Sequence, residues 1–287
     1  MSDEQVEKIE KAKEEEVTES VESEKVRTPD EVIDARPFYK VTFPSLGLLY
    51  SGKLPNGEAL VGPWTTREEA IFGDRVGVRP SAIFELMERC LKPVPGLPFG
   101  KLLLGDAFYI LMCARDFTFP GTPYTAKLQC QSCRAIFVHS IPVPEGIRIK
   151  SYTGDFEGEP FSIHLPQSNV QVDFRLLRVE NELEIQSYAT RILGQQKSLA
   201  RPGDPSYSYR LAQHIVALDG NKADLVSSLE FCDRMLGGDS LVLRRAIRDH
   251  ECGPNLLVEY TCRACGYSSE VMMPIDANFF RPEEFAA

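Results

Sequence analysis

Four cysteines form two pairs, each with two residues between its members. The first pair is Cys130 and Cys133, and the second is Cys262 and Cys265. Cysteines at this spacing can direct both sulfurs at one ion from a tight turn, and four thiolates complete the tetrahedral shell of a structural zinc ion. Such a set leaves no open position for catalysis. The spacing therefore predicts one structural Zn²⁺ ion.

The residues around the two pairs bear on how the ion would be held. Gly266 follows the second pair and permits the positive φ that such a turn often needs, whereas Arg134 stands at that place after the first pair. Four thiolates and one Zn²⁺ carry a net charge of −2. Arg134 and Arg263 would partly balance that charge.

The distance between the pairs along the chain is unusual, because residues 134–261 separate them. Joined zinc ribbons usually have a gap of about 15–20 residues. The tertiary fold must therefore bring the pairs together. The entropy of closing a loop grows only with the logarithm of its length, and zinc binding worth roughly 10–16 kcal/mol in small peptides exceeds it.

Two other interpretations of the pairs stay open. A redox-active CxxC usually opens a helix in a βαβ unit, which the patterns here do not predict, and the four thiols can also be unliganded. Cys252, close to His250, is an alternative ligand. The remaining cysteines lie on apolar helical faces and are expected to fill the core: Cys90, Cys113 and Cys232.

Catalytic patterns are weak, so the sequence predicts a protein that is not an enzyme. None of the four histidines lies in an HExxH motif, and there is no GxSxG motif. With a net charge of −10, the chain of 287 residues disfavours broad nucleic-acid binding. Because no signal peptide is recognisable and the most apolar stretch, residues 102–114, is too short to span a bilayer, we expect a cytoplasmic protein with reduced cysteines.

The chain is expected to begin with a separate acidic leader, residues 1–36. Between Met1 and Asp30 it has eleven Asp or Glu and five Lys or Arg, and no aromatic residue. Such a segment cannot bury enough apolar surface to fold by itself, so we expect disorder. The folded body is then residues 37–287. It is expected in two parts, about 37–150 and about 151–287, joined by the zinc site.

The body is predicted to be an α+β fold, mostly helical, with short antiparallel hairpins that carry a split zinc-ribbon-like site of four cysteines. Thr65 or Thr66 begins a helix with a capping box. Asp106 and Asp239 are expected to cap two others. Hydrophobic periodicity predicts helices over 82–91, 107–115, 180–193, 209–218, 223–236 and 240–250, and hairpins over 125–141, 161–176 and 256–273.

Short segments along residues 40–282 occur in an order that resembles a known family. They are Phe43–Tyr50, Trp64–Glu69, the apolar helix after Asp106, the first cysteine pair, Leu165–Leu176, Glu251–Pro254, Met273–Ile275 and Phe279–Pro282. This order is similar to that of the baseplate hub subunit and tail-assembly proteins of T-even-like, contractile-tailed bacteriophages. The acidic leader is not part of that pattern.

The resemblance implies a structural or assembly protein of the phage tail baseplate hub, present in the host cytoplasm during assembly or in the virion tail. Its partners would be phage baseplate hub or other tail proteins; no membrane is expected, and the charge of the chain disfavours nucleic acid. The zinc prediction rests on spacing and not on the resemblance. The alternative is a zinc-ribbon nucleic-acid-binding or transcription accessory protein, favoured by basic and aromatic residues near the cysteines: Arg134, Phe137, His139, Arg263 and Tyr267.

Overall fold

The computed structural model describes residues 36–72, 80–152, 158–196, 204 and 206–282. The chain divides into two units, residues 1–37 and 38–287, and the helices and strands named below belong to the second. The expected acidic leader, apart from Arg36, lies outside the described residues. None of the described helices has the length and hydropathy that crossing a membrane requires.

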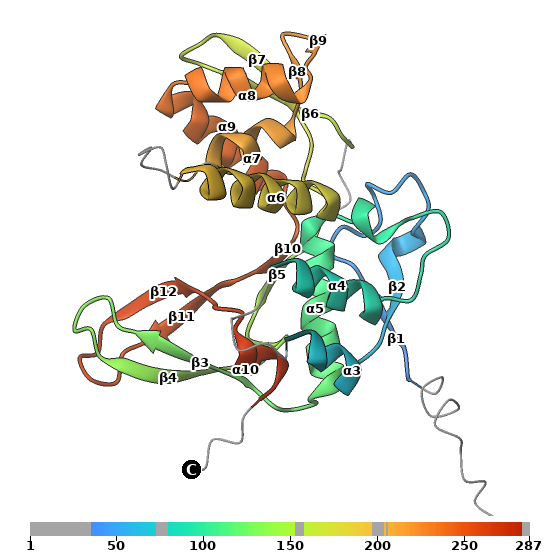
Figure 1. Cartoon of the computed structure of the whole chain (residues 1–287), viewed down its shortest axis with the longest axis vertical. Coiled ribbons are helices and arrows are strands. Elements are labelled where there is room, and N and C mark those ends of the chain that lie inside the picture. The colour runs from blue at the N-terminus through green and yellow to red at the C-terminus, as the bar shows by residue number, and fades with distance from the viewer. Residues whose placement is uncertain (1–35, 73–79, 153–157, 197–203, 205, 283–287) are drawn as a thin grey trace, which may run out of the picture. The chain divides into compact units, whose positions relative to one another are not determined.

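The expectation of a mostly helical body is wrong. The described part of the chain has eight α-helices and twelve strands, and the strands form four two-stranded sheets and one four-stranded sheet, all antiparallel (Figure 1). Strands β5, Arg148–Lys150, and β10, Gly253–Asn255, have three residues each. Strands so short show no clear alternation of apolar and polar residues, so periodicity alone does not detect them.

The N-terminal elements are a hairpin and helices, of which strand β2, Glu58–Val61, and helix α4, Pro80–Cys90, contact the apolar helix α5, Leu104–Thr118. In α5 every residue from 110 to 115 is buried, as expected for a helix that is apolar almost all round. The capping box between Thr65 and Glu68 is present as predicted. The elements are β1 Tyr39–Thr42, η1 Pro55–Gly57, β2 Glu58–Val61, α3 Thr66–Glu69, η2 Ala70–Phe72, α4 Pro80–Cys90, η3 Phe99–Lys101 and α5 Leu104–Thr118.

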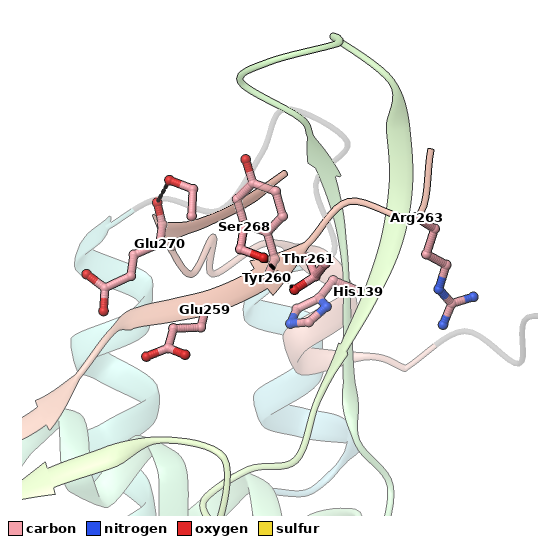
Figure 2. A pocket seen from close by; sticks show the side chains of 8 residues that line it. His139, Glu259, Tyr260, Thr261, Arg263, Ser268 and Glu270 are labelled. Atoms are coloured by element: carbon pink, nitrogen blue, oxygen red, sulfur yellow. Dashed lines mark hydrogen bonds between the residues drawn. The ribbon is translucent and has the colours of Figure 1, made fainter. Parts of the chain in front are cut away.

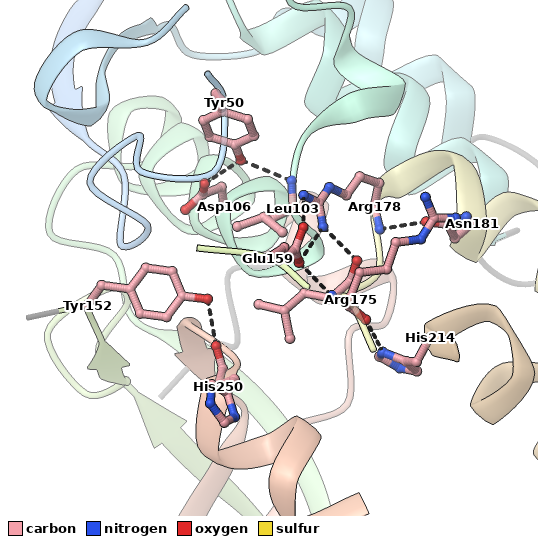
Figure 3. Close-up of polar contacts among 11 residues, drawn as sticks. Tyr50, Leu103, Asp106, Tyr152, Glu159, Arg175, Arg178, Asn181, His214 and His250 are labelled. Carbon is pink, nitrogen blue, oxygen red and sulfur yellow. Dashed lines mark hydrogen bonds and ion pairs between the residues drawn. The ribbon is translucent and has the colours of Figure 1, made fainter. Parts of the chain in front are cut away.

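Asp106 does not cap α5, contrary to expectation, because the helix starts two residues earlier and its N-cap is Leu103. Its fully buried carboxylate instead accepts hydrogen bonds from the backbone N–H and the hydroxyl of Ser45. It also accepts from the hydroxyl of Tyr50, and that hydroxyl in turn accepts from Leu103 N–H at 2.9 Å (Figure 3). Burial raises the pKa of Asp106, although these donors oppose the shift.

The middle of the body is a four-stranded sheet, ordered β6-β7-β8-β9, together with four helices. The helix expected over 209–218 is wrong in its second half: α7 ends at His214 and the chain continues directly as strand β8, whose β-branched start fits a sheet. The elements are β6 Phe161–Leu165, β7 Val170–Phe174, α6 Val179–Gln196, α7 Ser206–His214, β8 Ile215–Leu218, β9 Asn221–Lys222, α8 Leu225–Arg234 and α9 Gly237–His250.

Asp239 is also not a cap, because it lies inside the first turn of α9. Its carboxylate accepts the backbone N–H groups of Gln167 at 2.9 Å and Ser168 at 2.8 Å, in the turn between β6 and β7. Both aspartates therefore bind a turn distant in sequence rather than the start of their own helix.

Polar groups at the start of α6 fasten it to neighbouring segments (Figure 3). Arg178 pairs with Glu159 through two hydrogen bonds, of 3.0 and 2.6 Å, and both side chains are largely buried. Residues 103 and 178 form an antiparallel bridge, and Val179 N–H donates to Leu102 C=O at 3.0 Å. The connection before α5 therefore pairs with residues more than seventy positions later in the chain.

A close crossing joins α5 to strand β10, which pairs with β5. A β-carbon on Gly105 would lie 1.8 Å from the carbonyl oxygen of Cys252, and one on Gly253 would lie 2.4 Å from the α-carbon of Gly105. Only glycine allows two backbones to approach so closely.

The last elements are the hairpin β11 Leu257–Thr261 and β12 Ser268–Met272, and the short helix α10 Ala277–Phe280. Phe279 is fully buried, and its carbonyl accepts from the Nε of buried Arg115 at 3.1 Å. Tyr124 donates to the carbonyl of Pro274 at 2.6 Å. The C-terminal segment is thus fixed to the first cysteine hairpin and to α5.

Candidate metal centre

Two antiparallel hairpins present the cysteine pairs, and both were predicted from sequence. Strands β3, Tyr124–Gln129, and β4, Ile136–Ile141, flank the first pair, and β11 and β12 flank the second. In each hairpin the first cysteine follows directly on the incoming strand. The two hairpins run beside each other (Figure 1).

The two turns are copies of one geometry. In the first, Arg134 N–H donates to Cys130 C=O at 3.0 Å and Cys130 N–H donates to Ala135 C=O at 2.9 Å. In the second, Gly266 N–H donates to Cys262 C=O at 2.8 Å, and Cys262 N–H donates to Tyr267 C=O at 2.9 Å. Positions 130 and 262, and positions 134 and 266, are therefore equivalent.

The residue after each pair takes a left-handed backbone conformation. Gly266 has φ +72°, as the sequence predicted. Arg134 has φ +64°, a conformation that costs a residue with a β-carbon about 1–2 kcal/mol. The sequence could have indicated this strain, because aligning the two CxxC pairs places Arg134 at the position of Gly266.

The fold brings all four sulfurs together, as predicted. The sulfurs of Cys130, Cys133, Cys262 and Cys265 all lie within 4.8 Å of one another. Two pairs, Cys130 with Cys265 and Cys133 with Cys262, are 3.7 Å apart. A tetrahedron with metal–sulfur bonds of about 2.3 Å has sulfurs roughly 3.8 Å apart, so the cluster fits a four-thiolate site. A disulfide would need sulfurs at about 2.05 Å.

Contacts that do not involve the thiols also join the two hairpins. The rings of Phe137 and Tyr260 pack with centroids 5.4 Å apart. The Tyr260 hydroxyl accepts the N–H of Gln131, within the first turn, at 3.3 Å. Sequence reasoning missed Tyr260, which is buried and lies two residues before Cys262. Its aromatic type at an inward strand position was the available signal.

The local electrostatics favour a thiolate at one position and resist a second. The N–H groups of the turn, that of Cys133 first, lower the pKa of Cys130 to about 6. At Cys133, the N–H of Ala135 lowers the pKa, but the neighbouring thiols, Cys265 foremost, outweigh it and raise it. Four thiolates at this spacing repel one another unless a cation lies between them. The cluster is therefore suited to a cation.

The other cysteines do not join the cluster. Cys90, Cys113 and Cys232 are buried in the core, as predicted. Cys252, the alternative ligand, lies instead beside Tyr152 and near Asp106, and its burial raises its pKa well above the usual range. The sequence hypothesis of a ligand at Cys252 is therefore not supported by the geometry.

A groove of about 630 Å³ lies along the second cysteine hairpin (Figure 2). Glu259 and Glu270 are directly opposite each other across the two strands, and Arg148 from β5 pairs with Glu270 at 2.7 Å. Thr261 and Ser268, the next opposed pair, share a hydrogen bond of 2.9 Å. His139 also lines this groove, but it is not hydrogen-bonded to these carboxylates and hydroxyls, so they do not form a proton relay.

No family model, no curated protein and no solved structure matches this chain. The class of site is therefore defined by its geometry alone. The chain has four cysteines from two hairpins that lie close enough together to bind one metal ion.

Proposed function

We propose that the four cysteines bind one structural zinc ion. The observation that carries this proposal is the set of sulfur distances, 3.7 Å for two pairs and under 4.8 Å for all, which matches the edges of a tetrahedral four-thiolate site. All four positions would be protein sulfurs, so the ion has no place for a substrate or an activated water. The proposed role of the metal is structural.

The zinc ion would act as a clamp between distant parts of the chain. Cys133 and Cys262 are 129 residues apart in sequence, and each hairpin is a two-stranded sheet. Isolated two-stranded hairpins have marginal stability in water. A metal that binds only the assembled pair stabilises both hairpins together.

Elemental analysis of the purified, non-denatured full-length protein tests this proposal directly. We expect one zinc per chain, with the four cluster thiols protected from alkylation. Absence of zinc, together with rapid alkylation of all four thiols in the folded protein, would contradict it.

We also propose that this zinc-clamped body serves as a non-catalytic structural or assembly protein of a phage tail baseplate hub. The support is the ordered resemblance over residues 40–282, together with a metal set that leaves no reactive position. A hub protein must present fixed surfaces to its neighbours. The proposed metal clamp would make the two cysteine hairpins rigid, although each is only a two-stranded sheet.

The test is genetic. In a contractile-tailed phage that encodes this protein, loss of the protein should block completion of the tail or baseplate while heads still form, and the protein should co-sediment with hub or baseplate intermediates. Normal tailed, infectious particles without the protein would overturn this role.

The nucleic-acid alternative has weaker support. Arg134 and Arg263 lie at the exposed tips of the turns, but a zinc ion with four thiolates carries −2, which offsets these two charges. The chain as a whole has a charge of −10. RNA or DNA binding that persists at physiological salt would favour this alternative over the hub role.

A further inference from the structure

We infer that the cysteine cluster is a redox-sensitive latch, in which hydrogen peroxide replaces the metal by two disulfides that join the hairpins, Cys130 to Cys265 and Cys133 to Cys262. This inference rests on the proposed zinc site. It goes further by giving the site a second covalent state with a defined pairing.

The pairing follows from the sulfur contacts. Both contacts of 3.7 Å run between the hairpins, each joining one sulfur from the first turn to one from the second. Closing either contact to the length of a disulfide needs a movement of under about 2 Å. The hydrogen bonds inside each turn, from Arg134 to Cys130 and from Gly266 to Cys262, can remain while this happens.

Access to oxidant is selective. Cys133 and Cys265 are exposed, whereas Cys130 and Cys262 are buried, so each contact pairs one exposed sulfur with one buried sulfur. With the proposed zinc ion bound, the exposed sulfur is a thiolate and attacks peroxide, and its sulfenic acid then condenses with the buried neighbour. By contrast, burial raises the pKa of the core thiol Cys113 to about 11, which keeps it protonated and unreactive.

The reaction balances without any further reagent. Each pair of thiolates loses two electrons to one molecule of hydrogen peroxide, which takes up two protons and becomes two waters. Two peroxides therefore oxidise all four thiolates to two disulfides. Zinc leaves as Zn²⁺ with its oxidation state unchanged.

The consequence for the fold depends on which sulfurs pair. Disulfides between the hairpins keep residues 130 and 265 joined after the metal has left. Disulfides within each CxxC would leave the hairpins connected only by noncovalent contacts, such as the packing of Phe137 on Tyr260 and the hydrogen bond from Gln131 to Tyr260. The inferred pairing therefore predicts an oxidised protein that loses zinc but stays folded.

The experiment uses the full chain with Cys252→Ala, which removes a nearby thiol that lies outside the cluster. Zinc content is measured first, so that absence of metal is recognised as failure of the zinc proposal itself. The protein is then treated with two equivalents of hydrogen peroxide, the remaining thiols are blocked with N-ethylmaleimide, and a tryptic digest is analysed without reduction.

Trypsin separates the possible pairings. Cleavage after Lys127, Arg134 and Arg263 places Cys130 and Cys133 on one peptide, and Cys262 and Cys265 on two others. The inferred pairing joins all three peptides, and fragmentation between Cys130 and Cys133 assigns the partners. Pairing within each CxxC instead leaves the 128–134 peptide unattached.

We expect release of one zinc per chain, the three-peptide species with the inferred partners, and core cysteines that still react with N-ethylmaleimide after denaturation. Dithiothreitol and zinc should restore the starting state. An unattached 128–134 peptide, a three-peptide species with the opposite partners, or retention of zinc would each overturn the inference while leaving the zinc site standing.

Discussion

Arg134 and Gly266 occupy the same position in two copies of one turn, and both have a positive φ. Each donates its N–H to the carbonyl of the first cysteine of its pair, at 3.0 and 2.8 Å. The second turn thus has glycine, the residue best suited to a positive φ, whereas the first turn has arginine. The difference makes the second turn the place to measure what the conformation costs.

Gly266→Ala should destabilise the metal-loaded protein by about 1–2 kcal/mol, because a β-carbon is disfavoured at φ +72°. The space itself is open, since a β-carbon there would meet no atom within 4 Å. Urea unfolding measures the loss. Gly266→Asn is the matched control and should lose less, because asparagine tolerates this conformation; equal stability of all three proteins would argue against the strain account.

Cys262→Ser should abolish stoichiometric zinc binding and expose both cysteine hairpins to protease, because it removes a sulfur from the cluster. Elemental analysis and limited trypsin digestion read out the two effects. Cys252→Ala is the control, since Cys252 lies outside the cluster, and should keep its zinc. Full zinc content in the serine variant would exclude Cys262 as a ligand.

Gly105→Ala should destabilise the body by about 1–3 kcal/mol or more, because the new methyl group would overlap the backbone of residue 252 at 1.8 Å. Thermal and urea unfolding give the magnitude. Gly237→Ala, at the start of α9, is a helical glycine with no atom within 4 Å of the added carbon. That control should be neutral or slightly stabilising, and a similar loss in both variants would refute the close crossing.

Tyr50→Phe should cost about 1–3 kcal/mol, because it leaves the buried N–H of Leu103 and the carboxylate of Asp106 each without one hydrogen-bond partner. Tyr39→Phe removes the hydroxyl of a half-exposed tyrosine and should stay within about 0.5 kcal/mol of the wild type. Chemical denaturation of the two variants side by side checks the prediction. A neutral Tyr50→Phe would mean that water replaces the lost hydroxyl.

His214 should make stability fall in mild acid. Burial lowers its pKa from 6.5 to about 4, so below pH 6.5 the unfolded chain binds a proton that the folded chain does not. The stabilisation is complete above pH 6.5 and is lost as the pH falls toward 4. Between pH 7 and pH 5 this single group accounts for about 2 kcal/mol.

The measurement compares wild type with His214→Asn, whose amide can still donate to the carbonyl of Arg175, the acceptor that His214 Nδ1 approaches at 2.7 Å. Denaturant unfolding at the two pH values should show a smaller acid loss in the variant. Since both proteins have the same cysteine cluster, loss of metal cancels in the comparison. Equal acid loss would show that His214 is not the sensitive group.

The local parts of the fold could be predicted from sequence. The cysteine hairpins and the helix after Pro80 were found because turn residues and hydrophobic period act over a few positions. The features that the sequence did not predict depend on contacts between residues far apart in the chain. Asp106 and Asp239 have the residue type of a cap, but their carboxylates bind turns at Ser45 and Gln167, which no local pattern indicates.

The candidate site shows the same division. Cysteine spacing identified all four sulfurs that the structure brings together, because each turn is a local structure. The contact of Tyr260 with Gln131 depends on the opposing hairpin, which no local pattern indicates, whereas the strained φ of Arg134 belongs to its own turn and follows from aligning the two pairs. The expectation of a mostly helical body was wrong because short strands such as β5 and β10 were not predicted. Their pairing joins segments about a hundred residues apart in the chain.

The separation of Cys130 and Cys265 by 135 residues sets an order of events during folding. Such a long-range contact forms late, because the intervening chain must first be ordered. Either hairpin alone offers only two of the four cysteines, so tight capture of the proposed metal would wait until both are docked. The proposed zinc site therefore predicts that metal content marks maturation, and that a preparation containing partly folded chains would show a deficit of zinc.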